Sequence, residues 1–486
     1  MLKQVSPNLP AFLAQDILTS GVWISGVSKM VAERDQDLLA SLGRLAAKVK
    51  NEVEDALSCG GIQPEDEVFS RWKVDRFQYT ERGVTEFSAH GDYTTKKSWL
   101  RASVRLQESI KKSKEYSSAL ELLSKTFGEE AGRSRELESF VGKLIWRHLY
   151  EPKLDDADVS TVIGDFVKDL RDEPLKCGAQ VELEGIVIQP ERIELKMGDL
   201  DIVLRQTTIE DLEKEFPVYG FIGPRFMPHP SAILSIQFLG RYANEIQTNV
   251  ERAITVLRLF KVGSVRFISY RMFSESITDI MASGTITAGQ SEQALEKYLV
   301  TEADTDRLKK FWQTMMRVLP RNLYELGEAK SDHLSIAYKR YCDALMQNGL
   351  LERRIANCVM GLESLFLKGG EAQELAYRLS VRTGKLFGLL GHQPHKVRET
   401  IKDAYETRSL FVHGGHLSYK DRKGLERVYG DLRSFLTVLL DSLRLSILVT
   451  MFEKRDKDEF IDLIDESLID PEGPEEGDPR LLQPPA

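Results

Sequence analysis

Three side chains able to do acid–base and phosphate chemistry occur in the C-terminal third of this 486-residue chain. Arg408 and His413 stand five residues apart near the end of a predicted helix, and Glu363 lies on an earlier one. At 100° per residue, Arg408 falls in the middle of the apolar stripe of its helix. Because a guanidinium keeps its charge in proteins, that place requires either an acidic partner or a wet cleft.

Glu363 is the predicted partner of Arg408, since it falls at the inner edge of the apolar stripe of its own helix. A carboxylate that faces a guanidinium makes a natural bidentate pair. His413 precedes two glycines that should end the helix, where the negative end of the helix dipole favours a protonated imidazole. An offset of five residues is about 140° around a helix. Arg408 and His413 can therefore meet one substrate only if the last turn distorts or a second subunit closes the site.

Two more arginines lie on the preceding predicted helix. Arg382 falls on its apolar stripe, and Arg378 flanks it. Together with Arg408 and His413, they would give a local cationic groove. A purely structural interpretation stays open, because a buried Arg–Glu pair often does no more than hold two helices and a helix-terminal His is often only a cap.

The composition is that of a globular protein. Hydrophobic residues make up 42% and charged residues 29%, and the length suggests about three domains. With 66 Lys and Arg against 75 Asp and Glu, the net charge is −9, so any polyanion site must be a local basic patch. Four cysteines without a CxxC motif predict reduced thiols in a cytoplasmic protein. The N-terminus lacks a signal-peptide core and the apolar stretch 432–452 carries charges, so we expect no membrane span.

The elements that must position these residues form three predicted domains and a tail. Residues 1–150 are predicted to be mainly helical, with a loop-like piece at 65–93 and helices at 27–57, 96–113, 117–126 and 134–150. Residues 151–320 are predicted to form a small α+β module, a candidate sensor or regulatory domain. Its strands are expected at 180–188, 192–196, 201–205, 231–238 and 264–273, and its helices at 244–260 and after Thr208, with Asp211 in a capping box.

Residues 321–465 are predicted to form an all-α antiparallel bundle, because short glycine-containing loops separate long helices. These helices are expected at 332–348, 352–367, 371–390, 394–412 and 422–452. Residues 466–486 are acidic and Pro-rich, which predicts a disordered tail. The predicted fold class is therefore α+β multidomain, with a helical N-terminal region, a small α+β middle module and a C-terminal helical bundle.

The region that contains these residues resembles a known family. The run Arg408-Ser-Leu-Phe-Val-His413-Gly-Gly resembles the signature of HEPN domains, an Arg and a His separated by four to six residues at a helix end. Residues 354–365, 374–382 and 404–415 are similar to the Apea-like branch of that superfamily. The likeness covers about 321–465, and the strands at 183–188 and 201–205 look more loosely like the partner domain that accompanies this branch.

This resemblance implies an endoribonuclease that needs no metal and no cofactor, in which two copies of the motif form one composite cleft at a homodimer interface. His413 would act in acid–base catalysis, Arg408 would hold the scissile phosphate, and Glu363 would orient Arg408. Contacts with RNA are assigned to Arg378, Arg382 and Ser409, the last at a position where active members commonly carry Asn, Asp or His. The expected products carry 2′,3′-cyclic phosphate ends.

Apea-like proteins are associated with prokaryotic defence against phages, often by abortive infection, so the resemblance implies that role and a gate on the nuclease. The predicted partners are RNA, with tRNA as one candidate, a second copy of the chain and an unidentified trigger. The alternative is a catalytically silent HEPN domain used for dimerisation or RNA binding in a larger assembly. A small-molecule enzyme in the middle module has no supporting motif beyond the loop at 220–230.

Overall fold

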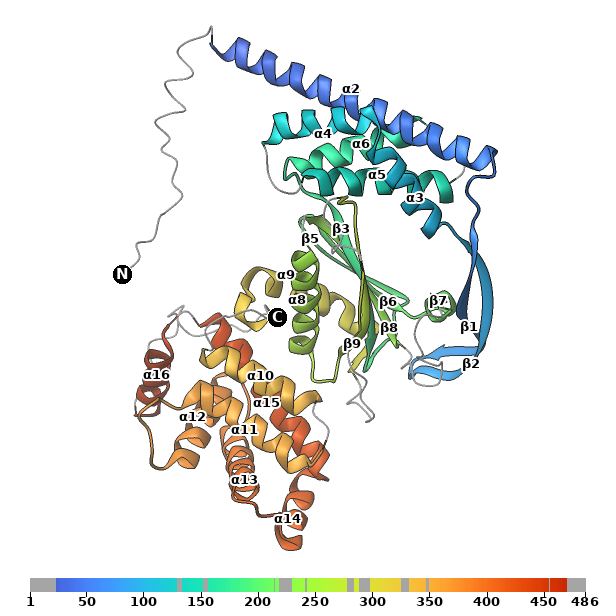
Figure 1. Cartoon of the computed structure of the whole chain (residues 1–486). Helices are drawn as coiled ribbons and strands as arrows, with labels where there is room; N and C mark the ends of the chain where they lie inside the picture. Colours follow the sequence, from blue (N-terminus) through green and yellow to red (C-terminus); the bar gives the residue numbers. More distant parts are fainter. Residues whose placement is uncertain are drawn as a thin grey trace.

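The computed structural model describes residues 23–128, 133–151, 156–213, 215–217, 230–240, 243–277, 284–287, 298–324, 332–346, 349–453 and 455–469. They form an α+β multidomain protein with a helical N-terminal unit, a central sheet and a C-terminal helical bundle (Figure 1). The predicted loop at 220–230 lies outside the described residues except for Pro230.

The N-terminal unit consists of five helices that bury their apolar faces against one another: α2 (Trp23–Ser58), α3 (Leu100–Lys111), α4 (Lys114–Phe127), α5 (Arg133–Tyr150) and α6 (Asp156–Leu170). In Figure 1, α2 lies across the others. Phe140 of α5 stacks on Phe166 of α6, with ring centroids 4.6 Å apart. Because α6 belongs to this core, the unit extends beyond the predicted boundary at 150.

A long β-hairpin leaves this unit, where the sequence analysis predicted a loop-like piece; that prediction was wrong. Strands β1 (Glu65–Thr80) and β2 (Gly83–Ser98) pair antiparallel, and β1 also pairs with β7 (Glu215–Pro217). The Tyr79 hydroxyl donates to the Ile188 carbonyl, which ties the hairpin to the middle module. The described side chains of β2 are mostly exposed, so the sequence lacks the apolar–polar alternation that reveals a half-buried strand.

The middle module contains a six-stranded antiparallel sheet of order β10-β9-β3-β8-β6-β5. The strands are β3 (Leu175–Glu184), β5 (Arg192–Met197), β6 (Leu200–Gln206), β8 (Ala232–Gly240), β9 (Arg266–Ser274) and β10 (Gly284–Thr287), while β4 (Ile186–Ile188) pairs with β11 (Tyr298–Val300). The strands expected at 192–196, 201–205, 231–238 and 264–273 are confirmed. The one expected at 180–188 is divided at Gly185, which has a φ of 77°, into β3 and β4 of two different sheets. The capping box is also confirmed, since the Thr208 N–H donates to the Asp211 carboxylate over 2.9 Å at the start of α7 (Ile209–Leu212).

Two helices of the middle module, α8 (Ala243–Phe260) and α9 (Thr305–Val318), pack on its sheet, and the 3-10 turns η3 (Glu302–Asp304) and η4 (Arg321–Leu323) flank α9. The bundle follows with α10 (His333–Met346), α11 (Leu351–Phe366), α12 (Leu375–Leu389), α13 (Pro394–Val412), α14 (Tyr419–Tyr429), α15 (Leu432–Phe452) and α16 (Lys457–Ile469). The first four predicted helices of the bundle are confirmed.

The predicted helix at 422–452 is two helices, α14 and α15. Gly430 adopts a φ of 88°, and the Asp431 carboxylate accepts a 2.6 Å hydrogen bond from the Ser434 N–H, so one helix ends and another begins there. Helix α16 was not predicted as a separate element, and its last turn overlaps the start of the predicted disordered tail. Residues 470–486 of that tail lie outside the described residues.

The middle module and the bundle share one continuous core, although the sequence analysis placed a domain boundary at 320. Helix α8 joins them. The Tyr338 hydroxyl of α10 donates to Thr255 Oγ1 over 3.0 Å, and the Tyr341 hydroxyl donates to the Arg258 carbonyl over 2.9 Å. A displacement of α8 would therefore disturb its hydrogen bonds with α10 of the bundle.

Among the described helices, α15 alone is long and apolar enough to cross a bilayer. The most apolar window of α15 is 61% buried within the protein, and its leucines pack against α10 and α11. Burial of that kind is typical of the central helix of a helical bundle.

Candidate active site

The predicted pair of Arg408 and Glu363 is formed between α13 and α11. Arg408 Nη2 lies 3.4 Å from Glu363 Oε2, and the side chains are 24% and 16% exposed. The contact is a single bond rather than the bidentate pair expected from the sequence. The pair is therefore accessible to solvent and to a ligand.

Most of the hydrogen-bonding capacity of Arg408 is unused. A guanidinium has five N–H donors, and only Nη2 of Arg408 bonds to another described residue. Nε is buried and has no partner in the described part of the chain. Tyr405, one turn earlier on α13, places its ring 5.5 Å from the guanidinium carbon. The remaining donors are suited to an oxyanion.

Glu363 lies in an environment that disfavours its charge. Burial raises the pKa of its carboxyl above the ordinary value, while the charge of Arg408 and a hydrogen bond from Tyr405 act in the opposite direction. Burial and the nearby Glu363 likewise raise the pKa of Tyr405. Tyr405 is a residue of the site that the sequence did not single out. Its spacing of three residues from Arg408 is the signal that could have placed it at the site.

His413 is exposed at the C-cap of α13, as predicted. The helix ends in a Schellman motif, in which the Gly415 N–H donates to the Leu410 carbonyl over 2.8 Å and Gly414 adopts a φ of 75°. The His413 N–H still donates to the Ser409 carbonyl over 3.2 Å. The last turn therefore keeps helical geometry, and Arg408 and His413 lie about 140° apart around the axis of α13. One chain does not turn both side chains to the same face of α13.

The cationic groove expected from Arg378 and Arg382 is not formed, which corrects the sequence analysis. Arg382 is 2% exposed and donates to Glu371, to Asp465 and to the Phe366 carbonyl. Arg378 also pairs with Glu371, over 3.0 Å. The physical reason is that two acidic residues reach these arginines from outside α12, one from the preceding loop and one from α16. We therefore do not retain Arg382 as a contact for RNA.

Ser409 is half-buried next to Arg408, and its hydroxyl makes no hydrogen bond to another described residue. A contact of Ser409 with RNA stays a prediction. Large apolar side chains are exposed on the elements around the end of α13, which the sequence analysis did not foresee: Leu410 and Val412 of α13, Tyr419 and Val428 of α14, and Val438 of α15.

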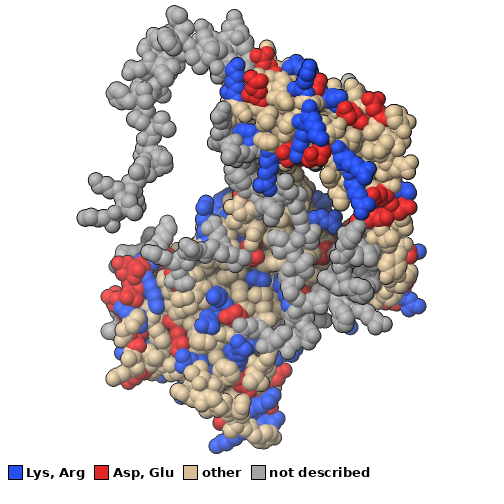
Figure 2. Space-filling view, in the orientation of Figure 1, with Lys and Arg blue, Asp and Glu red and all other residues tan. Residues whose placement is uncertain are grey.

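Basic and acidic side chains are interspersed on the visible face of the molecule (Figure 2). A site for a polyanion on that face would therefore be local, as the net charge implies. Among the described residues, no group of three or more His, Cys, Asp or Glu side chains is placed to hold a metal ion.

No family model, curated protein or solved structure matches this chain.

Proposed function

We propose that the C-terminal bundle is a metal-independent endoribonuclease of HEPN type that acts as a homodimer. The observation that carries the proposal is Arg408, whose guanidinium is held by Glu363 at a part-exposed position with most of its donors unused. An exposed imidazole follows on the same helix at His413. A cation that can hold the phosphate and a titratable base are the two groups that phosphodiester cleavage without a metal requires.

The nucleophile would be the 2′-hydroxyl of the RNA itself. His413 accepts its proton as the 2′-oxygen bonds to phosphorus. The bond from phosphorus to the 5′-oxygen then breaks, and that oxygen takes up a proton from water. The products are a 2′,3′-cyclic phosphate and a 5′-hydroxyl. Arg408 donates to the non-bridging oxygens, whose charge grows in the transition state. Glu363 is a positioning residue, because it acts through Arg408.

The geometry of α13 supports the proposed homodimer. Since Arg408 and His413 face different sides of the helix, a site that uses both is completed when Arg408 of one protomer meets His413 of the partner subunit. Exposed apolar side chains such as Val412, which is 52% exposed, offer surface for that contact.

The biological setting is proposed from the resemblance: a cytoplasmic nuclease in prokaryotic anti-phage defence, with RNA, tRNA included, as its substrate. An ungated ribonuclease would harm its host. The N-terminal unit and the middle module are the candidates for a gate on the nuclease, because α8 of the middle module is hydrogen-bonded to α10 of the bundle.

The deciding experiment is a cleavage assay on the full chain with total RNA and a tRNA pool in EDTA. Wild type, Arg408→Ala and His413→Ala are compared, and the RNA ends are analysed chemically. His395→Ala, which changes another exposed histidine at the far end of α13, is the matched control. We expect cyclic-phosphate ends from wild type and the control only.

The alternative, a silent dimerisation or RNA-binding domain, predicts RNA binding or dimer formation without new RNA ends from any variant. Melting temperatures complete the comparison. Cleavage that persists in a well-folded His413→Ala variant would contradict the assigned role of this histidine.

A further inference from the structure

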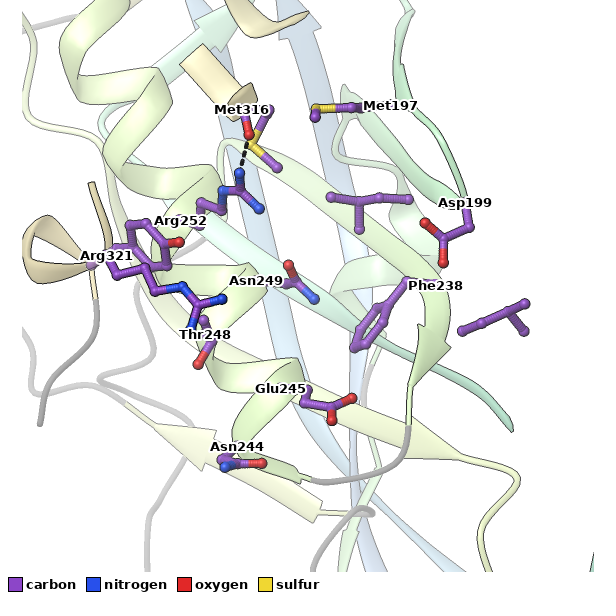
Figure 3. Close-up of a pocket in the computed structure, with 13 residues that line it drawn as sticks. Met197, Asp199, Phe238, Asn244, Glu245, Thr248, Asn249, Arg252, Met316 and Arg321 are labelled. Carbon is purple, nitrogen blue, oxygen red and sulfur yellow. Dashed lines mark hydrogen bonds between the residues drawn. The ribbon is translucent and has the colours of Figure 1, made fainter. Parts of the chain in front are cut away.

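A second candidate site lies in the middle module. A cavity of about 600 Å³ opens between the β5–β6 turn, the end of β8, the first half of α8 and the segment that follows α9 (Figure 3). Its volume is in the range of small-molecule pockets. None of the residues assigned to RNA cleavage lines it.

The cavity has two chemically different ends. Figure 3 shows Arg252 of α8 and Arg321 of η4 at one end, with Thr248 beside Arg321. Asp199 and Glu245 lie at the other end, and in this view the ring of Phe238 lies between them. A ligand that matches both ends carries an anionic group at one end and hydrogen-bond donors at the other.

Arg252 lacks a partner for part of its guanidinium. It donates to the Met316 carbonyl, and its guanidinium carbon lies 5.6 Å from the centre of the Tyr324 ring. Its Nε–H is buried without a hydrogen-bond partner in the described residues. The Arg252 side chain also lines the cavity, so an anion bound there would offset the charge of its guanidinium. Phosphate is the anion that best matches an arginine fork.

The acidic end of the cavity is tightly packed. A Cβ at Gly240 would lie 2.5 Å from Glu245 Oε2 and 2.3 Å from the Phe238 ring, so this arrangement depends on glycine. Carboxylates accept N–H and O–H groups, and an aromatic face stacks on a planar ring. A heterocyclic base with N–H donors on its edge fits both features.

We propose that this cavity binds a nucleoside monophosphate, with the phosphate at Arg252 and Arg321 and the base against Phe238, its N–H edge toward Asp199 and Glu245. Guanine suits this end best, because its two adjacent N–H groups can meet one carboxylate. The same helix that lines the cavity contacts the bundle through Thr255 and Arg258. The binding proposal is independent of the nuclease proposal.

Isothermal titration of the full chain tests it, with GMP, guanosine and inorganic phosphate as separate ligands. We expect GMP to bind more tightly than either fragment. Arg252→Gln should weaken GMP binding about tenfold or more, because it removes a charge-assisted contact. Arg307→Gln changes an exposed arginine of α9 outside the cavity and should leave the affinity for GMP unchanged.

A second variant keeps the test decisive if Arg252→Gln misfolds. Asp199 is exposed, so Asp199→Asn should fold normally. It should weaken GMP binding and leave the affinity for inorganic phosphate unchanged. The proposal is overturned if GMP gives no binding heat, if phosphate or guanosine binds as tightly as GMP, or if both cavity variants bind GMP like wild type.

Discussion

Arg382 and Glu371 are joined by two parallel hydrogen bonds of 2.7 and 2.8 Å, whereas Arg408 reaches Glu363 through a single contact of 3.4 Å. The Arg382 side chain is 3% exposed, and that of Arg408 is 24% exposed. These two Arg–Glu pairs of the bundle therefore differ in character. The first is saturated and structural, and the second is open and available to a ligand.

The two arginines should differ in their effect on stability. Arg382→Ala leaves Glu371 and Asp465 without their shared partner and should lower the free energy of unfolding by about 3 to 5 kcal/mol. Arg408→Ala breaks only a part-exposed contact and should lower it by about 1 kcal/mol. Thermal and urea unfolding of both variants checks this contrast. A loss for Arg408→Ala as large as that for Arg382→Ala would favour a purely structural role for Arg408.

Acid should destabilise the bundle by protonating Glu371. Its hydrogen bonds with Arg382 lower the pKa of this carboxyl from 4.5 to about 2 in the folded state. A depressed pKa means that the stabilisation is complete above the unfolded-state value and is lost as the pH falls from about 4.5 to 2. Glu371→Gln should flatten the pH dependence of the melting temperature in that window. An unchanged slope would show that other carboxyl groups control acid unfolding.

Tyr405 should lower the pKa of the Glu363 carboxyl. Its hydrogen bond holds the pKa of the Glu363 carboxyl below the value that burial alone would give. Tyr405→Phe removes that bond, so Glu363 should protonate at higher pH and release Arg408. We expect the pKa of the Glu363 carboxyl, followed by NMR of the labelled side chain, to rise in this variant. Tyr377→Phe changes a 57% exposed tyrosine of α12 outside the pair and is the control, and an equal shift in it would refute the assignment.

A composite site predicts complementation between inactive variants. In a mixed dimer of Arg408→Ala and His413→Ala, one site keeps the arginine of one protomer and the histidine of its partner. Because half of the dimers in an equimolar exchange are mixed and each keeps one of the two Arg–His pairs of the composite cleft, about a quarter of wild-type activity should return. No recovery after verified subunit exchange would show that both residues act within one chain.

The dimer contact should depend on the exposed end of α13. Val412 is 52% exposed, so Val412→Glu should cost little stability in the folded protomer while placing a charge in the proposed interface. Size-exclusion chromatography with light scattering should report a monomer that has lost cleavage. The control Val104→Glu changes a 54% exposed valine of α3, in a different unit, and should keep the wild-type mass.

Local patterns in the sequence predicted the helices that hold the candidate site. The spacing of apolar residues located α11 and α13, the two glycines located the end of α13, and the stripe positions of Arg408 and Glu363 predicted their contact. These predictions succeed because they depend on residues within one or two helical turns of one another.

Only the tertiary structure decided the partners of Arg382, the hairpin β1–β2 and the cavity lined by Arg252. Asp465 is 83 residues from Arg382 in the sequence, and the cavity gathers side chains from a strand turn, a helix and a 3-10 turn. The side chains of β2 are mostly exposed and leave no periodic apolar signal. Each of these features depends on contacts between segments that are distant in the sequence, so no short stretch of sequence predicts it. The pair of Arg408 and Glu363 differs because each residue lies on the apolar stripe of its own helix, and such a stripe is visible in the local sequence.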